Sequence, residues 1–140
     1  MENHVAIVIR NEHNHILFIK RSLNKKTLPG AWSFPSGTVE KEEKIYDTAI
    51  REAQEELGIT VSPERVFAKL NLEEFNVHLL FVLCMLKEGN PVIQARDEID
   101  SFQWMSFPEF FQMFSDDEIG HGLVWLRKNP QILERLTDVK

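Results

Sequence analysis

Residues 37–59 read GTVEKEEKIYDTAIREAQEELGI, and a helical spacing of apolar residues runs from Lys44 to Gly58 within them. Gly58 suits the left-handed backbone conformation that follows many helices. Three glutamates of the predicted helix stand three and four residues apart: Glu52, Glu55 and Glu56. Like charges at these spacings repel by a few tenths of a kcal/mol on a helix surface. Another interaction must therefore offset their repulsion.

The position of each acid relative to the apolar side of this helix indicates what that interaction is. At about 100° per residue, Glu56 falls inside the apolar arc, Glu52 lies at its edge and Glu55 lies further out. A solvated acidic face is the ordinary alternative, but it does not explain Glu56, because an unpaired buried carboxylate is costly. Arg51 can pair with Glu55, which leaves Glu52 and Glu56 without a partner. A bound divalent cation would reverse the local electrostatics.

The acid cluster predicts a particular chemistry. Mg²⁺ prefers oxygen ligands and takes one or two protein carboxylates together with substrate phosphate oxygens. Carboxylates one helical turn apart can hold such an ion, or Mn²⁺, and orient a metal-bound water. We therefore expect attack of that water on a phosphorus atom, with the ion offsetting charge on the phosphates.

Composition limits the classes of protein to which the chain can belong. Its 140 residues are 43% hydrophobic and 27% charged, as in one ordinary domain, so we expect a single domain over residues 1–140. The net charge of −6 argues against stable nucleic-acid binding, which needs a surplus of Lys and Arg. Binding of a small phosphate compound through a metal ion stays compatible with this charge.

The chain shows no signal for export or for a membrane. The N-terminus lacks a basic leader, and its apolar run from Val5 to Ile9 is too short for a secretory core. No stretch approaches the roughly 18 apolar residues of a membrane span. Cys84 is the only cysteine, which excludes an internal disulfide and predicts an inert buried thiol. These features predict a cytoplasmic protein.

Strand and helix patterns fill the rest of the chain. The polar turn NEHNH separates two predicted strands, and its His13 and His15 favour a solvated turn over a metal site. A long irregular connection of the kind that is often functional follows over residues 22–37. Strands are predicted at residues 5–10, 16–21, 65–75, 76–86 and 98–107; helices are predicted at 108–114 and, as two short pieces broken near Asn129-Pro130, at 116–136.

Residues 37–59 resemble the Nudix box. Nine constrained positions of that motif are matched: Gly37, Glu43, Arg51, Glu52, Ala53, Glu55, Glu56, Gly58 and Ile59. The flanking segments WSFPSG and EIDSFQWMSFPEF are also similar to the family's usual sequences. The resemblance implies the α+β Nudix fold, a mixed β-sheet between α-helices in which the box forms loop, helix and loop. It also implies hydrolysis of a nucleoside diphosphate linked to another group.

The resemblance also implies roles for individual residues. Glu52, Glu55 and Glu56 would hold the metal, with one of them or another glutamate as general base. Arg51 would orient these carboxylates, the backbone of Gly37 would be a further metal ligand, and Glu98 would be either an extra acid at the metal or a surface carboxylate. Gly37, Glu43 and Gly58 would shape the motif. Ser36 and Glu42 depart from the glycines that are common at their positions, which bears on loop geometry rather than on metal binding.

Substrate preference is less determined by the sequence. Family members that hydrolyse ADP-ribose often carry a Pro downstream of the box, and dinucleoside polyphosphate hydrolases a Tyr, whereas residues 74–77 here read EFNV. The resemblance then favours a MutT-type enzyme that cleaves a nucleoside triphosphate, normal or oxidised, to a monophosphate and pyrophosphate. Candidate phosphate contacts, with solvated surface side chains as the alternative, are Lys20, Arg21, Lys25 and Lys26. Candidate base contacts, with packing in the core as the alternative, are Phe75, His78 and Trp104.

Other interpretations stay open at this point. The substrate would alternatively be ADP-ribose, a nucleotide sugar or a dinucleoside polyphosphate. A non-catalytic module that senses nucleotides is a second possibility, although such modules usually lose metal-site acids. A structural protein that acts through its C-terminal helices is a third, but it leaves the position of Glu56 unexplained. The sequence does not distinguish a monomer from a homodimer.

Overall fold

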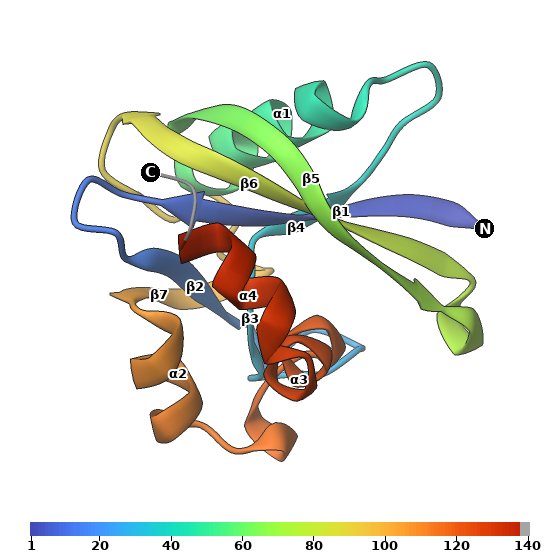
Figure 1. Ribbon diagram of the computed structural model, residues 1–140. Coiled ribbons are helices and arrows are strands. Elements are labelled where there is room, and N and C mark those ends of the chain that lie inside the picture. Colours follow the sequence, from blue (N-terminus) through green and yellow to red (C-terminus); the bar gives the residue numbers. More distant parts are fainter. Residues whose placement is uncertain (138–140) are drawn as a thin grey trace.

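The computed structural model describes residues 1–137, which form one mixed seven-stranded sheet with helices on both faces (Figure 1). The strands are β1 (Glu2–Arg10), β2 (Ile16–Arg21), β3 (Trp32–Ser33), β4 (Ser36–Thr38), β5 (Thr60–Leu72), β6 (Val77–Glu88) and β7 (Ile99–Met105). The helices are α1 (Ile45–Leu57), α2 (Phe107–Met113), α3 (His121–Lys128) and α4 (Pro130–Thr137), with 3₁₀ turns at Glu73–Phe75 and Asp116–Glu118. None of these helices has the length and apolar character needed to cross a membrane.

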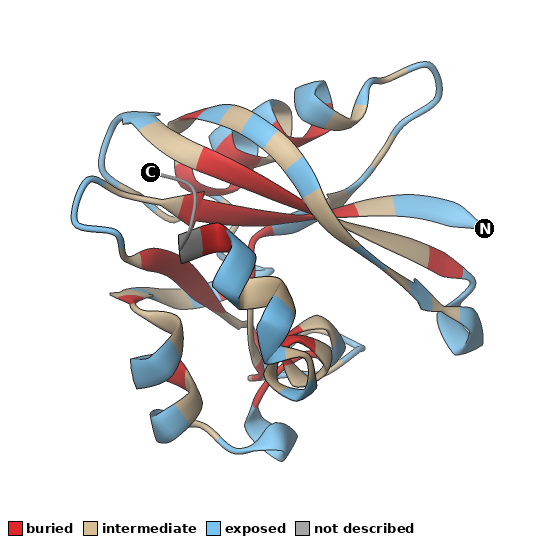
Figure 2. Cartoon of the chain, viewed as in Figure 1, coloured by how far each residue is buried: buried red, intermediate tan, exposed pale blue. Residues whose placement is uncertain are grey.

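The sheet is built around β1, which is covered on both faces. Its order is β3-β2-β1-β6-β5, with β4 paired to β1 and β7 paired to β2. β1 runs parallel to β6 and antiparallel to β4. Residues 5–9 are all buried (Figure 2), which agrees with their continuous apolar sequence. Because a strand's side chains alternate between faces, this run supplies two separate cores.

One core lies under α1 and the other under α2, α3 and α4. Ala49, Ala53 and Leu57 of α1 have no exposed surface and pack in one core with alternate, branched residues of β1. The second core contains these buried aromatic rings: Phe18, Phe34, Phe81 and Phe110. The predicted helix at 44–58 is confirmed, with Gly58 as a left-handed cap at φ 64°. The predicted burial of Cys84 is also confirmed.

Three differences from the predicted elements have local causes. The irregular connection before α1 contains the short strands β3 and β4, because its backbone pairs with β2 and β1. β5 begins at Thr60 rather than at residue 65, since it is an edge strand, where Pro63 is tolerated. The end of the predicted strand at 65–75 is wrong: residues 73–75 form a 3₁₀ turn, closed by Asn76 at φ 57°.

Candidate active site

Gly37 and Glu52 meet where β4 passes the middle of α1. Gly37 pairs with Val5 of β1, and the Glu52 side chain lies directly against the Gly37 Cα atom. A Cβ atom at position 37 would lie 1.8 Å from Glu52 Oε2, so a residue with a side chain would displace the carboxylate. The motif's first glycine therefore gives Glu52 the space it occupies.

Glu56 is the most buried acid of the site. Only 8% of its surface is exposed, as the helical pattern predicted, and the Ser36 backbone amide donates a hydrogen bond to its carboxylate. Burial, followed by the nearby charges of Glu52 and Glu98, raises the pKa of Glu56 to about 9. Burial also raises the pKa of Glu52, which is hydrogen-bonded to Glu56. Without a cation, the two carboxyl groups hold a proton between them near neutral pH.

Arg51 joins the loop before α1 to the helix. Its Nε and Nη2 atoms lie 2.7 and 3.0 Å from the two carboxylate oxygens of Glu43. Glu43 also accepts hydrogen bonds from the Thr48 hydroxyl at 2.7 Å and the Glu40 amide at 3.1 Å. The Arg51 hydrogen bond, with that from Thr48, lowers the pKa of Glu43 to about 2. Glu43 is therefore an ionised anchor for the loop between β4 and α1.

The same guanidinium reaches two of the helix acids. Arg51 Nη1 lies 3.2 Å from Glu55 Oε2 and 3.5 Å from Glu52 Oε2. The expectation that Arg51 leaves Glu52 without a partner is therefore wrong, because one side chain spans both acids. The Glu55 side chain is 58% exposed and turned toward Arg51, whereas Glu52 and Glu56 face each other.

The acid pair lines a cavity of about 530 Å³. Of the predicted substrate and metal contacts, Arg21, Lys25, Phe75 and Glu98 line it as well. Lys25 Nζ lies 3.3 Å from Glu98 Oε1, and Arg21 is fixed by donating Nε and Nη2 to the Thr27 carbonyl. Two cationic side chains therefore stand in the cavity that contains the acids.

Trp104 lies elsewhere than predicted for a base contact. It packs against the α1 side of the core and lines a separate pocket that also includes His13. It lies on β7, opposite Leu17 of β2, and does not line the cavity of the acid pair. The cavity also contains residues that the sequence did not single out: His4, Leu72, Leu79 and His121. No sequence signal connects these residues, because the fold alone brings β1, the β5–β6 hairpin and α3 together.

The donors at the acid pair suit a hard divalent ion. Glu52 and Glu56 supply carboxylate oxygens within hydrogen-bonding reach of each other, and Mg²⁺ takes one or two protein carboxylates and completes its shell with water or phosphate. Both carboxyl groups are destabilised as anions by burial, and a bound cation would remove that cost. Among residues 1–137, the structure brings no three or more His, Cys, Asp or Glu side chains together in a geometry that would hold a metal ion. Glu55 instead accepts a hydrogen bond from Arg51.

A profile of the family described as NUDIX domain matches residues 2–124. The chain belongs to the Nudix family. This confirms the resemblance drawn from residues 37–59, and the mixed sheet between helices confirms the predicted Nudix fold.

Comparison with individual Nudix proteins gives distant matches. Nudix hydrolase 2 of Arabidopsis thaliana is 29% identical over 109 residues, which cover 76% of this chain and 39% of that protein. The m7GpppN-mRNA hydrolase of Saccharomyces cerevisiae is 28% identical over 114 residues, or 73% of this chain and 12% of that protein. The chain thus spans less than half the length of these curated relatives.

Two solved structures are matched over a larger share of their own chains than these curated relatives. The MutT protein of Methanosarcina mazei Go1 superposes with a TM-score of 0.74 at 24% identity, covering 99% of this chain and 96% of that one. An ADP-ribose pyrophosphatase of Streptococcus suis superposes with a TM-score of 0.63 at 25% identity, covering 76% and 75%. The Nudix fold therefore accounts for nearly the whole chain.

Proposed function

We propose that this Nudix domain is a divalent-metal-dependent pyrophosphohydrolase that cleaves a nucleoside triphosphate to a nucleoside monophosphate and pyrophosphate. The observation that supports this best is the buried pair Glu52 and Glu56 in one cavity with Arg21 and Lys25. The cavity volume of about 530 Å³ lies within the range of small-molecule sites. Mg²⁺ or Mn²⁺ is the proposed cofactor.

In this mechanism each side chain has a distinct task. Glu52 and Glu56, with Glu55 and the Gly37 backbone as further candidates, would hold the cation, which would supply positive charge at the phosphates and lower the pKa of a water bound to it. Arg21 and Lys25 offset the remaining phosphate charge. A site carboxylate accepts the proton of the attacking water as its oxygen bonds to phosphorus. The phosphorus–oxygen bond to the leaving pyrophosphate then breaks.

The test is turnover of a nucleotide panel with product identification. The panel contains normal and oxidised dNTPs, NTPs, ADP-ribose, a nucleotide sugar and a dinucleoside polyphosphate, each with Mg²⁺ and with EDTA. We expect metal-dependent release of pyrophosphate from triphosphates. Glu52→Gln and Glu56→Gln should each lower kcat by about a hundredfold or more, while Glu12→Gln, in an exposed turn, should match the wild type.

The other outcomes separate the rival functions. Faster turnover of ADP-ribose or a dinucleoside polyphosphate would replace the triphosphate assignment while retaining the metal site. Binding of nucleotide without turnover of any panel member would identify a sensing module. Full activity in both glutamine variants would remove Glu52 and Glu56 from the mechanism.

A further inference from the structure

The cavity has a second end, which differs chemically from the acid pair. Besides the acids and cations, its lining contains the apolar side chains Leu28, Leu72, Val77 and Leu79 and the rings of Phe75 and His121. A smaller pocket of about 130 Å³ shares six lining residues with it: Arg21, Leu28, Ser36, Leu72, Leu79 and His121. The apolar lining therefore continues past the main cavity toward the start of α3.

Phe75 is unusual among the ten phenylalanines of the chain. It is 41% exposed, whereas each of the other nine is buried or half-buried. Its ring centroid lies 5.2 Å from that of His121, with 38° between the ring planes. An exposed apolar ring in a cavity wall is costly in water, and a ligand with a flat aromatic group would cover it.

The backbone fixes where this ring pair stands. Phe75 ends the 3₁₀ turn between β5 and β6, and the Asn76 amide donates to the Glu73 carbonyl at 3.1 Å. His121 is the first residue of α3 and follows Gly120, whose amide donates to the Trp32 carbonyl at 2.9 Å. The hairpin tip and the start of α3 thus meet on one side of the sheet (Figure 1).

We propose that Phe75 and His121 form the base-binding subsite, on which the nucleobase of the substrate stacks. This rests on the proposed function, because it places the phosphates at Glu52 and Glu56 and the nucleoside at the other end of the same cavity. Stacking uses the π faces that all bases share and tolerates any base. The subsite therefore selects nucleotides over inorganic polyphosphates, without demanding one particular base.

The experiment compares a ligand that has a base with one that lacks it. Dissociation constants of a nonhydrolysable nucleoside triphosphate and of inorganic tripolyphosphate are measured with Mg²⁺ by calorimetry. Phe75→Ala should weaken nucleotide binding by about tenfold and leave tripolyphosphate binding unchanged. Met113→Ala, which removes an exposed apolar side chain outside both cavities, is the matched control and should change neither constant.

Conservative variants separate stacking from other roles. Phe75→Trp and His121→Phe keep a ring and should retain nucleotide affinity, whereas His121→Ala should lower it. Unchanged nucleotide affinity in Phe75→Ala, or an equal loss for tripolyphosphate, would overturn the subsite. Loss of affinity in His121→Phe equal to that in His121→Ala would remove His121 from the stack. Because these are binding measurements, they decide the subsite even if the panel reveals no turnover.

Discussion

The carboxylate of Glu52 occupies the space that a side chain on residue 37 would need, with its Oε2 atom 1.8 Å from the position of a Cβ on Gly37. The backbone of Gly37 is not in the left-handed region, so alanine can adopt its conformation. Gly37→Ala should therefore fold but push the flexible end of Glu52 aside. We expect kcat/KM to fall by about tenfold or more, with a melting temperature within a few degrees of the wild type, measured by initial rates and circular dichroism.

Gly89 provides a control in which alanine should lower stability and leave activity unchanged, the reverse of the result expected for Gly37. Gly89 has φ 97°, a conformation that strains any residue with a Cβ, and it does not line the acid cavity. Gly89→Ala should lower the melting temperature and keep wild-type turnover. Wild-type kcat/KM in Gly37→Ala would show that the position of Glu52 does not matter for catalysis.

Metal binding should be coupled to proton release from Glu56. Its pKa is raised to about 9, chiefly by burial, so the folded, metal-free protein retains a proton between about pH 4.5 and 9 that the unfolded chain has lost. A cation must displace this proton. We expect nearly one proton released per Mg²⁺ bound at pH 7, measured by calorimetry in two buffers of different ionisation enthalpy, and affinity that rises with pH by up to about tenfold per unit.

The same pKa predicts how stability depends on pH. The folded state binds more protons than the unfolded state in this window, so the metal-free protein should lose stability as the pH rises from 5 to 9. Glu56→Gln removes the titrating group at residue 56, so its melting temperature should depend less on pH. Because the variant also lacks a proposed metal ligand, Mg²⁺ should not stabilise it, and EDTA should leave its melting temperature unchanged. Equal pH dependence of the melting temperature in both proteins would contradict this assignment.

The contribution of the Glu43–Arg51 pair to stability should have the opposite pH dependence to that of Glu56: it should be lost as the pH falls. The Arg51 contact lowers the pKa of Glu43 to about 2, so its contribution is complete above the ordinary value of 4.5 and is lost as the pH falls toward 2. Glu43→Gln should lower the melting temperature at pH 7 and weaken its dependence on pH below 4.5. Glu40→Gln, which removes a 66% exposed partner of the same arginine, should have little effect.

Much of the acid site was predictable because its signals are local. One helix carries Glu52, Glu55 and Glu56, and its periodicity alone placed Glu56 inside and Glu55 outside. The Phe75–His121 contact was not predictable, because it joins residues 46 positions apart through a hairpin tip and the start of a helix. Trp104 illustrates the same difficulty: its aromatic character suggested a base contact, but strand pairing with β2 decides which pocket it lines.

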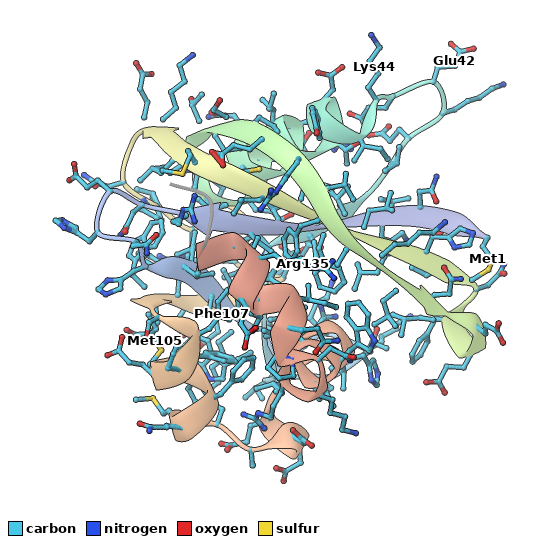
Figure 3. All side chains as sticks on the ribbon, viewed as in Figure 1. Met1, Glu42, Lys44, Met105, Phe107 and Arg135 are labelled. Carbon is cyan, nitrogen blue, oxygen red and sulfur yellow. The ribbon has the colours of Figure 1, made fainter. Side chains whose placement is uncertain are left out.

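The last prediction concerns Glu42, which takes the place of a common glycine in the motif. Its φ is 67°, in the left-handed region that disfavours residues with a Cβ, and its side chain points away from the molecule (Figure 3). Glu42→Gly should therefore raise stability by up to about 1 kcal/mol, or about 3 °C in melting temperature, without changing turnover. Lys41→Gly is the matched control: residue 41 has no positive φ, so glycine there should only add unfolded-state entropy and lower the melting temperature. Equal changes in the two variants would mean that backbone conformation at residue 42 costs nothing.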